Sequence, residues 1–211
     1  MKLKICGMKY PENIREVAAL EPDYMGFIFY PASARYAGED LDAAIVGSLP
    51  RKIKKVGVFV DAPAVKVLDI VKEYSLDLVQ LHGNESPEYC REISAEVQVI
   101  KAFGIHERFD FAVLDKYLPF CHYYLFDTKT EQHGGSGETF DWNILKKHKH
   151  RIPFFIGGGI GLTQVDDVSA LKSQLTHLAG IDVNSMFELS PGMKDMEALK
   201  KLKSKFSDGI K

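Results

Sequence analysis

The chain has 211 residues, of which 45% are apolar and 27% charged, with a formal net charge of -2 at neutral pH. This length and composition are typical of one globular domain with a substantial core, so we expect a single domain over 1–211. The nearly balanced charges exclude the strongly basic surface that nucleic-acid-binding proteins use. No apolar run approaches the roughly 20 residues of a membrane helix, and the first residues lack a secretory pattern.

Three cysteines, Cys6, Cys90 and Cys121, form no CxxC pair and show no metal-ligand spacing. An odd number of cysteines without a signal segment predicts reduced thiols and a cytoplasmic protein. Taken alone, each thiol is best interpreted as a small buried hydrophobe. The sequence leaves open whether the chain is a monomer or a homodimer.

Eight short runs rich in Val, Ile, Phe and Tyr predict buried strands. In chain order they cover 2–6, 24–30, 54–60, 77–82, 97–103, 122–127, 153–157 and 177–183. Stretches with helical periodicity lie between them, with one stripe of Ile14, Val17, Ala18 and Leu20 and another of Val65, Leu68, Ile70 and Val71. Strand and helix therefore alternate along the whole chain.

This alternation predicts a parallel α/β fold. Eight units in 211 residues average about 26 residues each, which is near the lower size limit of a (β/α)8 TIM barrel. A doubly wound open sheet is the alternative, but no GxGxxG follows the first strand and no Walker pattern occurs. We favour the barrel, in which the functional residues lie at the carboxyl ends of the strands.

Two glycine-containing loops follow the seventh and eighth strands, IGGGIG over 156–161 and DVNSMFE over 182–188. Glycine lets backbone N–H groups approach a ligand, and in barrels these two loops frequently bind phosphate. A single glycine loop is more simply a tight turn that binds nothing. Two such loops in these positions favour a phosphate site.

Several polar residues follow other strands. Asp127 ends the sixth strand, where a helix cap is the alternative role, and the long glycine-rich segment 128–140 after it is a candidate lid. Gln80 and His82 share one strand face and would point to the barrel mouth; a structural histidine is equally compatible. Arg35 suits an anionic group, although a solvated arginine is the simpler interpretation.

Cys6 and Asp127 are candidates for an acid–base pair. A thiolate at Cys6 accepts a proton, with Lys4 on the same strand face as a source of positive potential. Asp127 donates a proton if its surroundings keep it partly protonated. Such a pair fits a cofactor-free isomerisation of a phosphorylated sugar.

The chain resembles the phosphoribosylanthranilate isomerase family of tryptophan biosynthesis. The matching segments are KICGM (4–8), GFIFYPASARY (26–36), VGVFVD (56–61), VQLHG (79–83), FDTKT with GGSGETFDW, GGGI (157–160) and PGMKD (191–195). They occur in the family's order along nearly the whole chain. The resemblance implies a (β/α)8 barrel and an Amadori rearrangement of the small molecule N-(5'-phosphoribosyl)anthranilate, with no cofactor and no metal.

The resemblance also implies roles for individual residues. Cys6 would be the general base that removes the C2' proton, and Asp127 the general acid that protonates the ribose ring oxygen. Arg35 would face the anthranilate carboxylate. The remaining expected ligand contacts are Gln80, His82 and Asp182 for the substrate, and Gly158, Gly159, Asn184 and Ser185 for its phosphate.

Two departures from the family pattern lie in the phosphate loops. Ile156 precedes the glycines where the family has serine, and Met186 replaces a glycine, so we expect crowding of the phosphate, or strain if its φ is positive. Two rival functions remain. Indole-glycerol-phosphate synthase is a related barrel, but it uses lysine and glutamate at strand ends, and here the first strand ends on Cys6. The other rival is a non-catalytic phosphoribosyl-binding barrel.

Overall fold

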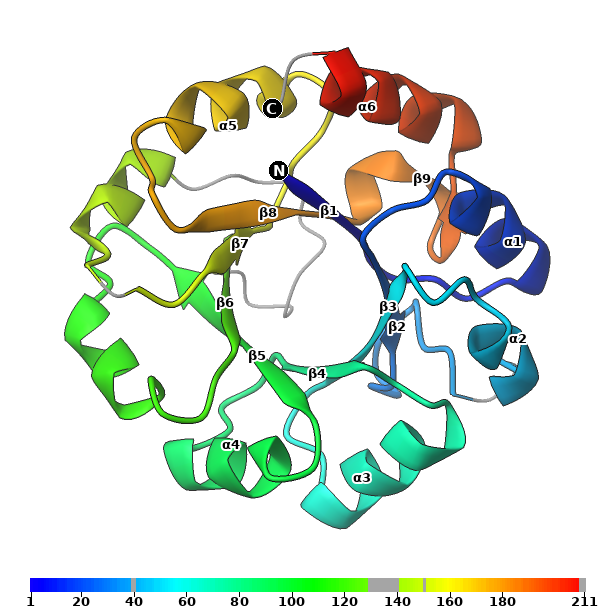
Figure 1. The fold of residues 1–211 in the computed structure, drawn as a ribbon, viewed down its shortest axis with the longest axis horizontal. Helices are drawn as coiled ribbons and strands as arrows, with labels where there is room; N and C mark the ends of the chain where they lie inside the picture. Colours follow the sequence, from blue (N-terminus) through cyan, green and yellow to red (C-terminus); the bar gives the residue numbers. More distant parts are fainter. Residues whose placement is uncertain (39–40, 129–140, 150, 209–211) are drawn as a thin grey trace.

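The computed structural model describes residues 1–38, 41–128, 141–149 and 151–208. Eight parallel strands form a closed barrel in sequence order, with β1 pairing to both β2 and β8. Figure 1 shows the helices arranged around the outside of this barrel. The predicted (β/α)8 architecture is therefore confirmed.

Each predicted strand run overlaps one strand of the barrel. The strands are β1 Lys2–Ile5, β2 Tyr24–Ile28, β3 Lys54–Phe59, β4 Leu78–Leu81, β5 Gln98–Ile105, β6 Tyr123–Thr128, β7 Phe154–Ile156 and β8 Leu178–Val183. Their parallel register aligns the carboxyl ends, as where Ile5 pairs with both Met25 and Val183. Side chains that follow neighbouring strands therefore meet at one end of the barrel.

The outer layer contains α-helices and shorter 3-10 helices. They are α1 Pro11–Ala19, α2 Ala43–Gly47, α3 Ala64–Glu73, α4 Pro87–Ser94, η1 Phe111–Lys116, η2 Trp142–Lys147, α5 Gln164–Lys172, η3 Ser185–Phe187 and α6 Met196–Asp208, with the hairpin β9 Glu188–Ser190 and β10 Met193–Lys194. Proline is the first residue of α1 and α4, where its missing N–H breaks no helical hydrogen bond.

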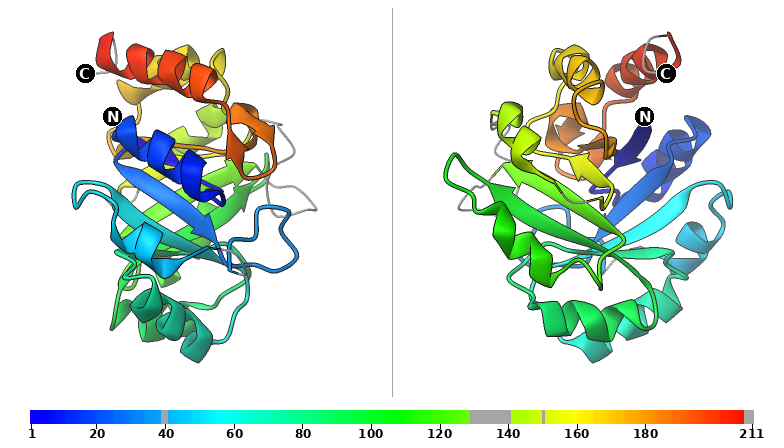
Figure 2. Two further views of the ribbon diagram at one scale, coloured as in Figure 1. Left: turned by 90° about the vertical axis from the view of Figure 1, so that its right-hand side faces the viewer. Right: turned by 60° about the vertical axis from the view of Figure 1, so that its left-hand side comes forward.

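The ring of helices closes where the last helix, α6, reaches the first, α1 (Figure 1). On one side α6 lies beside α5 (Figures 1 and 2), and Lys205 of α6 forms an ion pair with Asp166 of α5. On its other side, the Lys203 ammonium donates to the Glu21 carbonyl that follows α1. The last helix thus contacts both the preceding helix, α5, and the segment that follows the first helix, α1.

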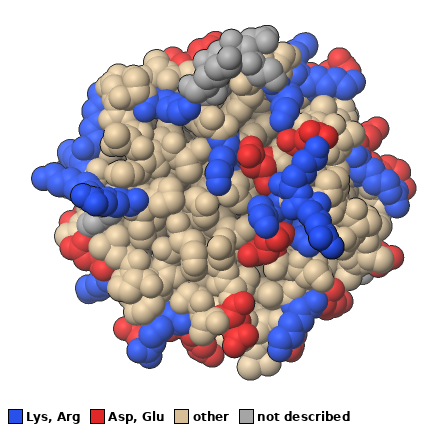
Figure 3. Space-filling model, viewed as in Figure 1, with Lys and Arg blue, Asp and Glu red and all other residues tan. Residues whose placement is uncertain are grey.

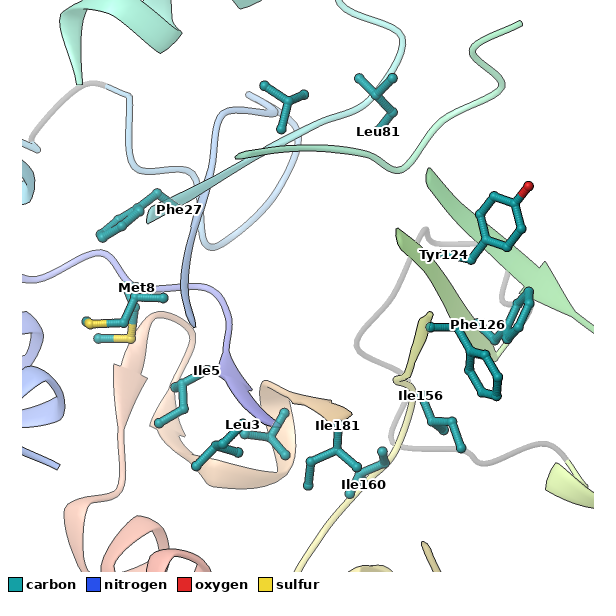
Figure 4. Close-up of a cluster of buried hydrophobic side chains, with 14 of the residues drawn as sticks. Leu3, Ile5, Met8, Phe27, Leu81, Tyr124, Phe126, Ile156, Ile160 and Ile181 are labelled. Carbon is teal, nitrogen blue, oxygen red and sulfur yellow. The ribbon is translucent and has the colours of Figure 1, made fainter. Parts of the chain in front are cut away.

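The apolar core has two parts. The larger part lies between strands and helices, and Figure 4 shows side chains of β1, β6, β7 and β8 within it. The smaller part fills the barrel interior with Tyr24, Val56, Leu78, Ile100, Ala102, Leu125 and Phe155. Residues two positions further along these strands share the same face. The inner cluster therefore forms the floor beneath the inward-facing residues at the carboxyl ends of the strands.

One helical stripe differs from its prediction. In α1 the buried face includes Ile14, Val17 and Ala18, as expected. In α3 Val67 is the buried apolar residue, whereas Val65 is 72% exposed. The prediction for Val65 was wrong because the run 64–71 contains apolar residues in more than one helical phase.

The molecular surface has mixed charge. Figure 3 shows Lys and Arg interspersed with Asp and Glu over one face of the molecule. No helix in the described part of the chain has the length and apolar character needed to cross a membrane.

Candidate active site

A pocket opens at the carboxyl ends of the barrel strands. Every site residue predicted from the sequence lines it: Cys6, Arg35, Gln80, His82, Asp127, Gly158, Gly159, Asp182, Asn184 and Ser185. Apolar side chains, including Ile28, Val58, Ile160 and Met186, also line the pocket. Barrel closure therefore brings together residues from six different strand ends, although their roles remain predictions.

Cys6 follows β1 and is buried, with its backbone N–H bonded to the Val183 carbonyl at 2.9 Å. A Cβ atom at Gly26 of β2 would lie 2.7 Å from the Cys6 sulfur, so the glycine leaves room for the thiol. Burial raises the pKa of the Cys6 thiol because it disfavours the thiolate, while the nearby Lys4 ammonium acts in the opposite direction.

Lys4 and Asp182 form a buried ion pair next to this thiol, with 2.9 Å between Nζ and Oδ1. Burial by itself would lower the pKa of Lys4, but the negative charges of Asp182 and Cys6 outweigh burial and raise it. For Asp182, burial raises the pKa and Lys4 opposes the rise. Lys4 therefore stays a cation beside the sulfur, as its place on the strand face predicted.

Asp127 lies on β6 at the opposite side of the pocket mouth from β1. Its Oδ1 accepts a hydrogen bond from the Thr128 N–H at 2.8 Å, and its Oδ2 lies 3.3 Å from Nε2 of His82. The other ring nitrogen of His82, Nδ1, lies 2.9 Å from Nε2 of Gln80. Gln80 and His82 thus face inward, while their neighbours Val79 and Leu81 pack in the outer core, as strand alternation predicted.

Arg35 is held by a carboxylate that the sequence did not single out. Its Nε and Nη2 bond to Glu188 at distances of 2.8 to 3.0 Å, and Lys194 Nζ lies 2.7 Å from the same carboxylate. Burial would raise the pKa of Glu188, but the two cations outweigh it and lower the pKa. These contacts use one edge of the Arg35 guanidinium, so the residue is oriented before any ligand binds.

Lys194 also fixes part of the expected phosphate loop. Its Nζ donates to Oδ1 of Asn184 at 2.7 Å. A Cβ atom at Gly7 would lie 2.5 Å from that same oxygen, so the Asn184 side chain packs closely over the turn after Cys6. Sequence reasoning missed Lys194 because a lysine in a short hairpin is ordinarily solvent-exposed.

The glycine turn after β7 has the backbone expected of a close approach to a ligand. Gly158 and Gly159 have φ values of 80° and 61°, in the left-handed region that favours glycine. Met186, which we expected to crowd this site or to be strained, is 49% exposed, and its φ is not positive. The expected strain is therefore absent.

A further buried ion pair supports the loop after β4. Lys101 Nζ lies 3.0 Å from Oε2 of Glu85 and donates to the carbonyls of Leu81, Gly83 and Ala102. Glu85 in turn accepts from the Gly83 N–H. This loop follows His82 directly. Sequence reasoning missed the pair, and the signal that could have found it is a lysine within the apolar run 97–103.

The predicted lid over 128–140 is only partly in view. Thr128 is the last residue of β6, and 129–140 lie outside the described residues.

Comparison with known proteins identifies the family. The family model for N-(5'phosphoribosyl)anthranilate (PRA) isomerase matches residues 3–205. A curated N-(5'-phosphoribosyl)anthranilate isomerase of Parabacteroides distasonis is 43% identical over 203 residues, covering 95% of this chain and 90% of the relative.

Two solved structures agree with this. The phosphoribosyl anthranilate isomerase of Thermus thermophilus superimposes with a TM-score of 0.87 at 30% identity, covering 98% of each chain. A phosphoribosyl anthranilate isomerase in complex with reduced 1-(o-carboxyphenylamino)-1-deoxyribulose 5-phosphate has a TM-score of 0.77 at 29% identity, covering 97% of each chain.

Proposed function

The chain belongs to the N-(5'-phosphoribosyl)anthranilate isomerase family, and from this premise we propose its reaction and the residues that perform it. The enzyme converts N-(5'-phosphoribosyl)anthranilate to 1-(2-carboxyphenylamino)-1-deoxyribulose 5'-phosphate in tryptophan biosynthesis. The observation that carries the proposal is the presence of Cys6 and Asp127 in one pocket at the carboxyl end of the barrel.

Asp127 acts as the general acid. Its proton passes to the ribose ring oxygen while the bond from that oxygen to C1' breaks. The lone pair of the anthranilate nitrogen forms a C=N bond to C1', which opens the ring to an iminium ion. A positioned acid of this kind contributes about 10²–10⁴-fold to the rate.

Cys6 acts as the general base. Its thiolate removes the proton from C2', the C–H electrons form a C1'=C2' double bond, and the iminium nitrogen recovers its electron pair. The resulting enol amine becomes the ketone product when the 2'-hydroxyl loses a proton and C1' gains one. The sum is an isomerisation, so atoms and electrons balance without a redox cofactor.

Lys4 increases the fraction of Cys6 that is present as thiolate, which burial alone would keep low. Burial raises the pKa of the thiol, and the Lys4 ammonium lowers it again by stabilising the thiolate. Asp182 keeps the ammonium in place through its 2.9 Å contact. Holding Lys4 is therefore a more direct role for Asp182 than the expected contact with the substrate.

The other pocket residues bind the substrate. The free edge of the Arg35 guanidinium takes the anthranilate carboxylate, because Glu188 occupies the Nε and Nη2 edge. The backbone around Gly158, Gly159, Asn184 and Ser185 receives the phosphate. Gln80 and His82 line the wall near Asp127.

The test is a fluorescence assay that follows loss of phosphoribosylanthranilate. We expect Cys6→Ser and Asp127→Asn each to lower kcat by about 10²-fold or more, because each removes one proton transfer. Cys90→Ser is the matched control, since Cys90 is also a buried free thiol but does not line the pocket.

Full activity in either site variant would contradict the assignment of acid and base. Absence of turnover in the wild type, together with binding of a reduced product analogue, would instead support a non-catalytic binding protein.

A further inference from the structure

The hydrogen bonds around His82 define where its ring proton lies. Gln80 Nε2 is 2.9 Å from Nδ1 of His82, and His82 Nε2 is 3.3 Å from Oδ2 of Asp127. A ring nitrogen that accepts from an amide N–H carries no proton. The ring proton is therefore on Nε2, from which it points to the carboxylate. In this arrangement a neutral imidazole faces an ionised Asp127.

The other end of the Gln80 amide is unsatisfied. Its Oε1 is buried and has no hydrogen-bond partner within the described part of the chain, although buried polar atoms in folded proteins are almost always paired. A half-turn of the amide exchanges Oε1 and Nε2. The oxygen would then face Nδ1 of His82, which requires a proton on Nδ1.

We propose that Gln80, His82 and Asp127 form a proton relay, in which a half-turn of the Gln80 amide switches the His82 tautomer and lets Asp127 hold the proton that it gives to the substrate. The relay rests on the proposed function, because it assumes that Asp127 is the general acid. It makes Gln80 a positioning residue and His82 the source of the proton.

The relay conserves protons and electron pairs. The relay starts with Asp127 ionised and the ring protonated on Nε2, and the lone pair of His82 Nδ1 takes a proton from solvent. The Nε2–H bond then breaks, its electron pair stays on Nε2, and the proton forms an O–H bond with Oδ2 of Asp127. The product is a neutral ring that donates from Nδ1 to Oε1 of Gln80 and accepts at Nε2 from the Asp127 acid. When Asp127 has given its proton to the substrate, the ring loses the Nδ1 proton to solvent and takes one on Nε2 as the Gln80 amide turns back, so the net uptake is one solvent proton for each proton delivered.

The charges around the ring favour the transient imidazolium. The carboxylates that face it are Asp127 from β6 and Asp182 from β8, and Asp182 is in an ion pair with Lys4 of β1. The nearest cation on β5, Lys101, is bound to Glu85 and to the loop carbonyls after β4. Because Lys4 offsets the charge of Asp182, Asp127 is the main group that stabilises a positive ring during transfer.

The tautomer can be read directly from long-range nitrogen–proton NMR spectra of the histidine rings. His82→Gln identifies the His82 signals among those of the seven histidines. In the wild type at pH 8 we expect the Nε2–H tautomer. In Gln80→Glu we expect Nδ1–H already at pH 8, because a carboxylate can only accept.

Gln80→Met and Gln98→Glu complete the set of variants. Methionine has a similar length but lacks the amide that bonds to Nδ1 of His82 in either tautomer. We therefore expect kcat to fall about tenfold to a hundredfold, with KM changed less than about threefold. This loss is smaller than the loss expected when the acid itself is removed. Gln98 is exposed at the start of β5. Gln98→Glu repeats the Gln80→Glu substitution at this exposed position and should leave the His82 spectrum and kcat unchanged.

The outcomes separate the relay from the reaction. A wild-type ring with Nδ1–H at pH 8, or a Gln80→Glu spectrum identical to the wild type, overturns the relay even if turnover is normal. Absence of turnover together with the expected change of tautomer in Gln80→Glu overturns the proposed reaction and with it the delivery of a proton to the substrate, whereas the coupling between the Gln80 amide and the His82 tautomer stands.

Discussion

The two ends of the barrel contain the same kinds of ion pair in opposite surroundings. At the carboxyl end the pairs are buried: Lys4–Asp182, Lys101–Glu85 and Lys194–Glu188. At the amino end they are largely exposed: Lys52–Glu21 and Lys54–Asp77. Charges removed from water interact more strongly and keep fixed positions. The carboxyl end therefore has the fixed charges that the proposed proton transfers need, whereas the amino end is a solvated surface.

Strand β1 shows the same difference within one face. Lys2 and Lys4 are two residues apart, so both point into the barrel. At the amino end, Lys2 Nζ donates to the hydroxyls of Tyr24 and Tyr123, at 3.0 and 3.3 Å. Burial raises the pKa of Tyr24 to about 12, so its hydroxyl stays neutral. At the carboxyl end Lys4 pairs with Asp182 beside the thiol that we propose as the base.

The largest effect is expected from breaking a buried pair at the carboxyl end. Lys101→Met leaves the Glu85 carboxylate buried without its cation, and removal of one member of such a pair costs about 3–5 kcal/mol of unfolding free energy. Urea unfolding measures this as a lower midpoint at an unchanged m-value.

The double variant Lys101→Met with Glu85→Gln is the control. It removes the uncompensated charge, so it should recover much of the lost stability. Equal stability of wild type and Lys101→Met would mean that this pair is as weak as an exposed one.

A smaller effect, on activity, is expected at Lys4. Burial raises the pKa of Cys6 and Lys4 lowers it, so Lys4→Met should raise it further. The thiolate then forms only at higher pH, and the acidic limb of the kcat/KM profile moves to higher pH. At a fixed pH on that limb, the rate falls in proportion to the thiolate fraction, about tenfold when the thiol pKa is higher by one. The deficit shrinks as pH rises.

Lys2→Met is the matched control for this change, because it makes the same substitution on the same face of β1 at the other end of the barrel. Its acidic limb should coincide with that of the wild type. A loss in Lys4→Met that is equal at every pH would contradict electrostatic support of the thiolate and indicate a purely structural role.

Much of the fold could be predicted because its signals are local. Strand runs, helical periodicity and turn residues each span only a few positions, and their alternation defines a parallel α/β fold. The phase of α3 could not be predicted, since Val65 and Val67 are equally apolar and only tertiary packing selects Val67. The element Trp142–Lys147 is a 3-10 helix, and apolar spacing over six residues does not distinguish such a helix from an α-helix.

The members of the pocket could be predicted for a different reason. A closed barrel brings all carboxyl strand ends together, so a residue's place at a strand end was enough to select it. Its partners could not be predicted in this way. Arg35 and Glu188 are 153 positions apart, and neither residue type indicates whether the pair is buried. For Lys101 the sequence does indicate that a partner exists, because a charge inside a buried strand requires one.

The smallest effect is expected from breaking an exposed pair at the amino end. Lys54 Nζ lies 3.2 Å from Oδ1 of Asp77, but half of the Lys54 side chain is exposed, and solvent screens such pairs to about 0.2–1 kcal/mol. Lys54→Met should therefore shift the urea midpoint only slightly and leave kcat and KM unchanged. Salt at about 0.5 M should reduce even this difference, because it screens exposed charges. A loss as large as that of Lys101→Met would show that burial does not explain the different stability contributions of the ion pairs at the two ends, since residue type and contact distance are similar in both pairs.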